Sequence, residues 1–263
     1  MPGVPIIDVL FSLDSLSQEH LPQPLELAKE MDRAAIDRVL LTPCRRWRCE
    51  RHWGADGVSH AEVNSFVTAL PQRFTGLAAY NPYAVPESLA LLELAIENDY
   101  CGAYVQTEGS DVGVAESRMY PLYSRCQHAG IPVIIQVGVS MSNIAAPEEL
   151  STVAEDFSTL KIVAGVCGPI DLPATLALCE RYSNLYFAFD GSLLFPDDIR
   201  RFRNSEVALH RAMFGSNGCR WLDLIDCFAR IDLPYEFMRA FMHDNAGTVF
   251  QLAGVTEKQG VAR

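Results

Sequence analysis

The sequence predicts a single (β/α)8 (TIM) barrel with additional C-terminal helices. Eight short apolar or β-branched runs alternate with amphipathic helical runs along almost the whole chain, and this alternation is typical of βαβ units and a parallel sheet. The 263 residues suffice for eight such units. No GxGxxG or GxxxxGKS/T loop follows an early strand, so an open doubly wound sheet is the second choice.

The expected strands are short and rich in Val, Ile, Leu, Phe and Tyr. In order along the chain they are residues 5–11, 37–43, 75–81, 102–108, 132–138, 161–168, 185–191 and 211–217. The expected helices begin at Pro or Ser in several cases, and one ends at a glycine, Gly130. They are residues 24–35, 59–70, 86–98, 119–130, 146–157 and 173–183, followed after the last strand by 221–231 and 234–252. The last two would cover an end of the barrel.

The chain reads as one domain. No linker rich in Pro, Gly or Ser and no low-complexity segment divides it. We therefore expect the barrel to span residues 1–254 and a short tail to follow at 255–263.

Composition limits the function. Hydrophobic residues make up 49% of the chain, enough for a sizeable core. The net charge of −12 argues against general binding of nucleic acid. No apolar run reaches the roughly eighteen residues of a membrane span, and the N-terminus lacks the features of a secretory signal. We expect a cytoplasmic protein that binds neither nucleic acid nor membrane.

The eight cysteines are scattered and mostly lie within apolar runs. No CxxC pair and no zinc-finger spacing occurs among them. We expect reduced cysteines that act as small core residues.

Several segments resemble one family of barrel enzymes. The stretches are "HAEVNSFVTALPQRFTGLAAYNP", "YPLYSRCQHAGIPVIIQVG", "LKIVAGVCGP", "FGSN" and "HDNAGTVFQLAG". They are similar to the amidohydrolase-related (amidohydrolase 2) family, the TIM-barrel group that includes aminocarboxymuconate-semialdehyde and resorcylate decarboxylases. The resemblance runs over nearly the whole chain and implies an enzyme whose site lies at the C-terminal ends of the strands.

The metal-binding residues that the resemblance implies are missing. An active member would have histidines at Leu10, Ser12, Gln136 and Val166, and an aspartate at Asn217. Aliphatic side chains cannot bind a metal, and neutral hydroxyl or amide oxygens hold a transition metal poorly. We therefore expect no metal and no other cofactor.

Asp190 is the preferred catalytic residue. It closes the seventh expected strand behind Phe187 and Phe189, where apolar neighbours suit a carboxylate that transfers protons. The alternative is a turn or helix-cap role. Asp8 has a more structural position. Cys167 follows a former ligand position, but no histidine at a strand end would activate it, so core packing is the simpler interpretation.

Polar side chains at other strand ends are candidate substrate-binding residues. Gln136 and Asn217 would donate hydrogen bonds to a carbonyl or oxyanion, or would bond to each other and fill the former metal position. The remaining candidates at strand ends are Ser12, Asn81 and Gln106.

The segment "CRRWRCERHW" is a local basic and aromatic cluster in an acidic chain. Arg45, Arg46 and Arg48 would bind a carboxylate or phosphate, and Trp53 would cover an apolar ring. The alternative is a solvated loop paired with the chain's own acids. His52 is the one histidine expected near the mouth, and it and Cys167 are the further candidate catalytic residues after Asp190. The other histidines are assigned to helices or loops: His20, His60, His128, His210 and His243.

These residues favour a metal-independent enzyme that acts on a small anionic organic molecule. Hydrolysis of a lactone or ester, decarboxylation and cyclisation all fit. The alternative is a non-catalytic descendant that binds a ligand or partner protein through the same mouth. A homodimer is the candidate oligomeric state.

Overall fold

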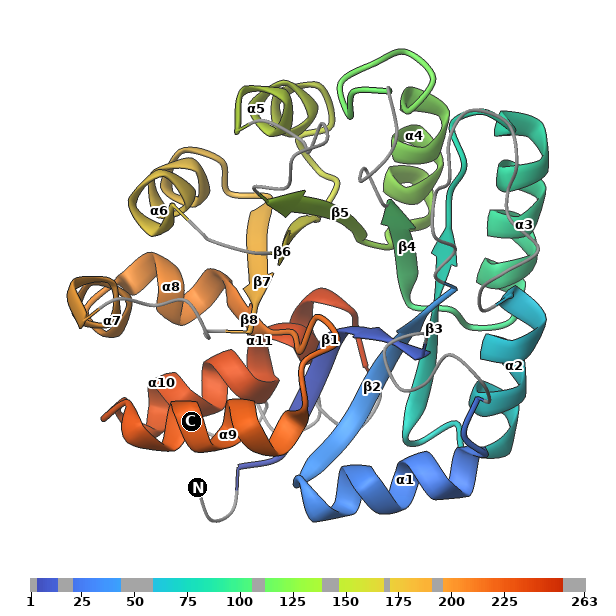
Figure 1. Cartoon of the computed structure of the whole chain (residues 1–263). Coiled ribbons are helices and arrows are strands. Elements are labelled where there is room, and N and C mark those ends of the chain that lie inside the picture. Colours follow the sequence, from blue (N-terminus) through green and yellow to red (C-terminus); the bar gives the residue numbers. More distant parts are fainter. Residues whose placement is uncertain are drawn as a thin grey trace, which may run out of the picture.

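The computed structural model describes residues 4–13, 21–43, 59–105, 112–138, 147–167, 171–190 and 196–252. Eight parallel strands form one sheet in the order β1-β2-β3-β4-β5-β6-β7-β8, and helices surround it (Figure 1). The strands are β1 (Ile6–Ser12), β2 (Ile36–Thr42), β3 (Phe74–Ala79), β4 (Gly102–Val105), β5 (Val133–Gly138), β6 (Ile162–Cys167), β7 (Leu185–Phe189) and β8 (Ala212–Phe214). The predicted (β/α)8 barrel is confirmed.

The helices agree with the predicted ones except between β7 and β8. They are α1 (Pro24–Arg33), α2 (His60–Ala69), α3 (Val85–Glu97), α4 (Tyr120–Ala129), α5 (Pro147–Asp156), α6 (Leu172–Arg181), α7 (Pro196–Arg203), α8 (Glu206–Arg211), α9 (Trp221–Arg230), α10 (Tyr235–Arg239) and α11 (Asn245–Val249). Neither α7 nor α8 was predicted. A π-helical turn, Ala240–Asp244, joins α10 to α11, so the last predicted helix is continuous but not regular.

Local sequence explains several boundaries. The Ser59 side chain accepts a hydrogen bond from the Glu62 backbone N–H, and the Glu62 carboxylate accepts one from the Ser59 backbone N–H. This reciprocal capping box begins α2. The Asp171 carboxylate caps α6 by accepting from Ala174 N. Gly130 ends α4 in the left-handed conformation, with a φ of 70°.

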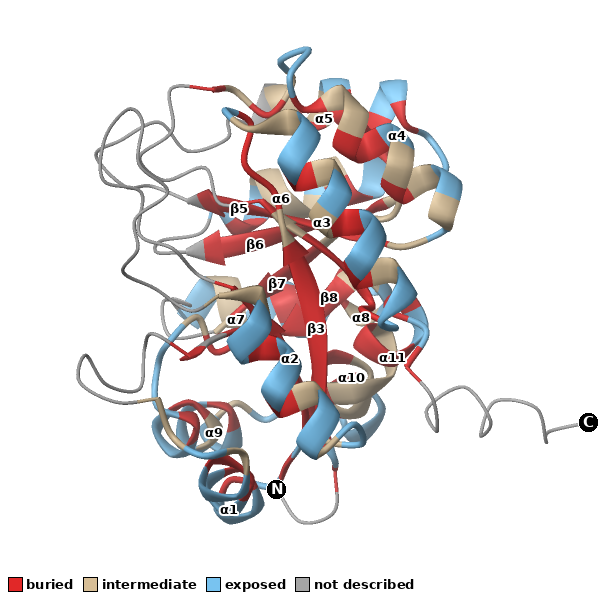
Figure 2. Cartoon of the chain, turned by 90° about the vertical axis from the view of Figure 1, so that its right-hand side faces the viewer, coloured by how far each residue is buried: buried red, intermediate tan, exposed pale blue. Residues whose placement is uncertain are grey.

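The core has two layers, because alternate residues of a strand face opposite sides. The outer core lies between the sheet and the helices, and the buried strands stand out in the middle of Figure 2. The second layer, which we call the barrel interior, is lined by the strand residues Ile7, Val9, Leu10, Leu40, Leu77, Ile134, Val163, Ala188 and Met213.

The final helix closes the barrel end at which the strands begin. Ala246, Val249 and Phe250 pack into the barrel interior, and Lys161, just before β6, donates to the carbonyl oxygens of Thr248 and Val249 at 3.3 Å. The predicted covering role is confirmed for this helix but not for α9, whose buried residues Trp221, Leu224 and Phe228 pack in the outer core. The opposite end, where the strands finish, is left for a site.

Among the described residues, no helix is long and apolar enough to cross a lipid bilayer.

Candidate active site at the C-terminal ends of the strands

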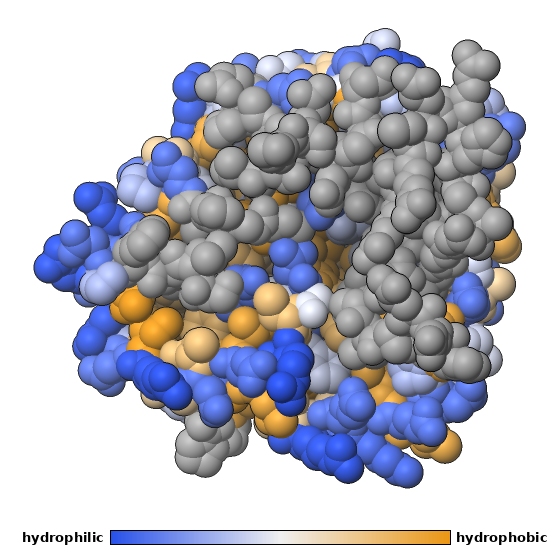
Figure 3. Space-filling view, in the orientation of Figure 1, coloured by the Kyte–Doolittle hydropathy of each residue, from blue (hydrophilic) through white to orange (hydrophobic). Residues whose placement is uncertain are grey.

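Figure 3 shows the molecule in the orientation of Figure 1, with hydrophobic residues visible in the hollow between the grey atoms. We call the face at which the strands end the mouth. Successive residues of a strand face opposite sides, so a residue whose two neighbours pack in the outer core points into the barrel. Such residues set the floor and the walls of the candidate site.

Asp190 lies directly after β7, at the end of the barrel where the strands finish. Phe187 and Phe189 of β7 pack in the outer core, whereas Ala188 lies in the barrel interior. Asp190 continues the interior side by alternation. It is half-buried, and its Oδ2 atom accepts a hydrogen bond from the Cys219 thiol at 3.6 Å.

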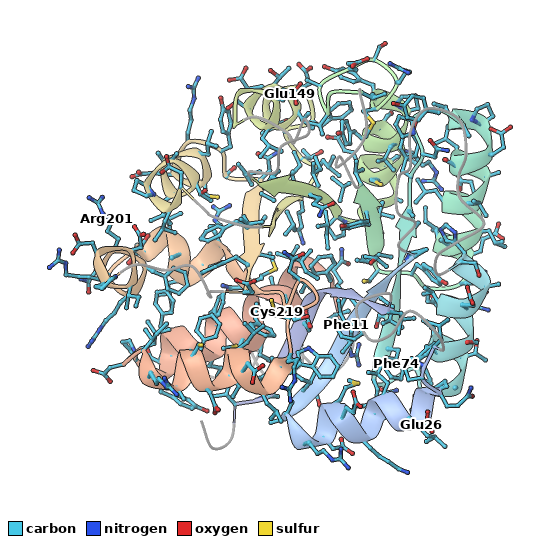
Figure 4. All side chains as sticks on the ribbon, viewed as in Figure 1. Phe11, Glu26, Phe74, Glu149, Arg201 and Cys219 are labelled. Atoms are coloured by element: carbon cyan, nitrogen blue, oxygen red, sulfur yellow. The ribbon has the colours of Figure 1, made fainter. Side chains whose placement is uncertain are left out.

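Cys219 is a mouth residue that the sequence did not single out. It comes from the segment between β8 and α9 and is labelled in Figure 4. Partial burial and the nearby Asp190 carboxylate raise the pKa of the Cys219 thiol. The thiol is therefore held protonated and acts as a hydrogen-bond donor to Asp190, not as a ready nucleophile.

Asp8 has the structural role that was expected. Its side chain is fully buried and accepts three hydrogen bonds, from Leu10 N at 3.1 Å, Ser216 N at 2.9 Å and Trp221 Nε1 at 2.7 Å. The Trp221 ring also stacks on Phe11 at 4.7 Å between centroids. Burial raises the pKa of Asp8, partly offset by these bonds. Asp8 thus joins β1 to the end of β8 and to α9.

Leu10 occupies the floor of the mouth. Its side chain is 7% exposed and belongs to the barrel interior. Two glycines make room for it. A Cβ atom added at Gly215 would lie 2.7 Å from Leu10 Cβ and Cγ, and one added at Gly165 would lie 2.9 Å from Leu10 Cδ2. Leu10 therefore reaches from β1 toward both β6 and β8. Position 10 is one at which the family resemblance implies a metal-binding histidine.

The two amides occupy the wall. Gln136 is buried and faces inward, between Ile135 and Val137 of the outer core. Asn217 follows β8 with a left-handed φ of 51°. Its backbone N donates to Leu10 O at 2.9 Å, and its side-chain Nδ2 donates to Val166 O at 3.5 Å. Asn217 therefore spans the ends of β1, β6 and β8.

The expectation that Val166 holds a ligand position in the mouth is wrong. Val166 packs in the outer core, and the inward-facing residue beside it is Gly165. A shift of one residue moves a strand side chain to the other face of the sheet. The missing ligand on β6 therefore belongs to the glycine or to the next inward position, not to Val166.

Asn81 lies in the turn after β3. Its Oδ1 atom accepts from Tyr83 N at 2.9 Å, and its backbone N donates to Ser88 Oγ at 3.0 Å. The side chain is buried, and its one amide oxygen already accepts the hydrogen bond that holds the turn. Its role in substrate binding stays a prediction.

Two further residues near the mouth were not predicted. Tyr104 of β4 packs against the barrel interior and is half-buried. His60, expected on a surface or at a helix cap, is half-buried, and its Nε2 atom accepts from Ala79 N at the end of β3 at 3.2 Å. In this contact the Nε2 atom is the acceptor, which leaves Nδ1 as the donor position of the ring. Neither contact has a local sequence signal, because both depend on neighbouring strands.

The remaining predicted site residues are not tested by these contacts. His52, Arg45, Arg46, Arg48, Trp53 and Gln106 lie outside the described residues, and for Ser12 and Cys167 only the backbone is described, at the ends of β1 and β6.

The donor set of the described side chains does not fit a catalytic metal. Nowhere in the described ranges do three or more His, Cys, Asp or Glu side chains gather so that they could hold an ion. At the positions where the resemblance implies ligands, the described side chains Leu10, Gln136 and Asn217 are one aliphatic group and two neutral amides. Asp190 and Cys219 add one carboxylate and one thiol, fewer than the three protein ligands of a catalytic zinc.

The sequence also matches a known family. The family model described as amidohydrolase matches residues 52–252. The chain belongs to the amidohydrolase family. Comparison with curated protein sequences found no match.

Several solved structures are similar to this chain over almost its full length. An uncharacterized TIM-barrel protein from Bordetella bronchiseptica is 20% identical with a TM-score of 0.73, over 94% of this chain and 98% of that one. A 5-carboxyvanillate decarboxylase from Novosphingobium aromaticivorans, complexed with manganese and 4-hydroxy-3-methoxy-5-nitrobenzoic acid, is 12% identical with a TM-score of 0.69, over 95% and 97%. A probable 2-pyrone-4,6-dicarboxylic acid hydrolase from Acinetobacter baumannii with citric acid bound is 12% identical with a TM-score of 0.60, over 94% and 99%. At these identities the likeness establishes the fold.

Proposed function

We propose that this amidohydrolase acts on a small anionic organic molecule without a metal, either by hydrolysing a lactone or ester or by a decarboxylation or cyclisation step. The observation that carries the proposal is Asp190, a half-buried carboxylate directly after β7 that accepts a hydrogen bond from Cys219. Leu10 stands at a position where the family resemblance implies a metal ligand and packs close to Gly165 and Gly215. Proton transfer by Asp190 is the chemistry that we propose.

Asp190 serves either reaction through one exchanged proton. In hydrolysis its carboxylate takes a proton from water, the water oxygen bonds to the carbonyl carbon, the C–O bond of the ester breaks, and the alkoxide takes the proton back. In decarboxylation the C–C bond to the departing CO2 breaks, and the electron pair left on carbon takes a proton through Asp190, which recovers one from solvent water. Gln136 and Asn217 offer amide donors to the oxygen that gains charge.

The relatives support the substrate class. The decarboxylase that resembles this barrel was crystallised with a nitrobenzoic acid, and the probable pyrone hydrolase with citric acid. Both are small organic acids. The manganese of the decarboxylase has no matching donor set among the described residues of this chain, so the proposal carries over the substrate class and not the metal.

Arg45, Arg46 and Arg48 stay the proposed anion-binding residues, and Trp53 and Gln106 stay proposed substrate-binding residues. His52 and Cys167 are the further proposed catalytic residues. Arginine is suited to a carboxylate because its guanidinium group donates two parallel hydrogen bonds.

The test is a turnover screen of lactones, esters, and aromatic and β-keto acids, followed by the Asp190→Asn variant. Asparagine keeps the shape but does not titrate, so turnover should fall by about 10²–10⁴-fold while the melting temperature stays within a few degrees. Full turnover in Asp190→Asn would remove this residue from the mechanism. A chain that binds such acids but turns over none of them would favour the non-catalytic alternative.

A further inference from the structure

We infer that the mouth receives a ring-bearing acid with its ring against Leu10 and its carboxylate directed outward, so that Leu10 determines which substituents are accepted opposite the carboxylate. This inference rests on the proposed function, because it assumes a small organic acid in the mouth. It adds the orientation of that acid and the residue that selects it.

The floor is apolar and built around one side chain. Leu10 packs with Ile134 and Met213 in the barrel interior. The absence of side chains at Gly165 and Gly215 is what lets Leu10 lie across the axis, because a Cβ atom at either would come within 3 Å of it. The half-buried ring of Tyr104 packs against the same interior. Such a surface gains free energy by covering an apolar ring.

The charges oppose a carboxylate at this floor. Arg38 of β2 is buried one inward position before Leu40, nearer the strand starts. From Leu40 toward the strand ends, no described inward-facing strand residue is Lys or Arg. The Asp190 carboxylate lies at the strand ends, beside Cys219. An anion pushed down to Leu10 would lose its hydration without gaining a cation. Its favourable position is therefore at the rim, with the ring below.

This orientation predicts a rule for substituted benzoates. The position para to the carboxylate points at Leu10. A methyl group there should be accepted, because it buries apolar surface on a leucine side chain. A second carboxylate there should be rejected, because the floor offers no positive partner among the described residues.

The first experiment measures the dissociation constants of 4-methylbenzoate and terephthalate for the full chain by calorimetry. These probes share the ring and one carboxylate and differ only at the para position. We expect 4-methylbenzoate to bind at least about tenfold more tightly, given the cost of burying an unpaired charge. Equal or tighter binding of terephthalate would overturn the inference.

The second experiment deepens the floor with Leu10→Ala. The space left should admit a longer chain, so the affinity for 4-propylbenzoate relative to 4-methylbenzoate should rise by roughly tenfold, from about 0.8 kcal/mol for each newly buried CH2 group. Leu92→Ala is the matched control, because Leu92 is a buried leucine of α3 in the outer core. It should lose stability without changing the ligand ratio. An unchanged ratio in Leu10→Ala would contradict the assignment.

The outcomes separate this inference from the proposed function. If both probes bind and the para preference is absent or reversed, the orientation is wrong while the acid-binding mouth stands. If neither probe binds, the inference and the substrate class proposed above fail together. If Leu10→Ala does not fold, the para preference of the wild-type chain decides alone, and Leu10→Met should preserve that preference because its side chain stays apolar and of similar volume.

Discussion

At the scale of single residues, the contact between Cys219 and Asp190 makes the thiol a reporter of the carboxylate. Partial burial first, and then the Asp190 charge and hydrogen bond, raise the pKa of Cys219. Only the thiolate reacts with an alkylating reagent. The contact therefore predicts a reactivity change that does not depend on knowing the substrate.

Asp190→Asn should speed alkylation of Cys219. Removing the charge lowers the pKa of the thiol, so at pH 8 a larger fraction is thiolate and the rate with iodoacetamide should rise severalfold. Peptide mass spectrometry follows each cysteine separately, and Cys227, which is exposed on α9, is the internal control. A Cys219 rate that stays the same or falls would mean that the two side chains are not in contact.

The family resemblance predicted that Gln136 and Val166 both point into the mouth. Gln136 does face inward, because Ile135 and Val137 on either side of it pack in the outer core. Val166 does not, because the motif match did not fix the register and a shift of one residue changes the face. Cys219 and His60 could not be predicted in this way. Their contacts join residues far apart in sequence, and no local pattern records them.

At the scale of elements, the buried Asp8 carboxylate holds β1, β8 and α9 together through three donors. The Asn217 backbone adds a bond from the end of β8 to Leu10 O. Because β8 is only three residues long, these bonds replace much of the missing ladder on that side. The positions of Leu10 and Asn217 in the mouth therefore depend on the Asp8 carboxylate.

Asp8→Asn should lower the free energy of unfolding by about 1–3 kcal/mol, because an amide cannot accept from all three donors and leaves one buried without a partner. Asp171→Asn is the control, since asparagine also caps a helix and Asp171 is exposed. Both variants are followed by urea unfolding. An Asp8 variant as stable as the wild type would show that the junction contributes nothing.

The stability difference between wild type and Asp8→Asn should also depend on pH. Burial raises the pKa of Asp8 in the folded chain, so proton binding favours folding. The stabilisation from this group is complete below the unfolded-state pKa and is lost as pH rises through the higher folded-state pKa. The difference in unfolding free energy between wild type and Asp8→Asn should therefore be larger at pH 4 than at pH 8. A difference that shrinks on acidification would contradict the direction of the shift.

At the scale of the whole molecule, the fold was predictable because its signals repeat. All eight described strands begin within one residue of the predicted starts, and the proline and glycine boundaries recur from one βα unit to the next. The segment between β7 and β8 was not predicted because "PDDIRRFR" is mostly charged and α8 has only six residues, so neither gives a long apolar period.

The central claim is that this amidohydrolase works without the metal found in its decarboxylase-like neighbour. The direct measurement is elemental analysis of protein purified from medium supplemented with manganese and zinc, paired with unfolding and turnover before and after chelation. The account predicts well under about one equivalent of metal per chain, with the melting temperature and turnover unchanged by chelator. One equivalent of tightly held metal, whose removal abolishes turnover, would contradict it.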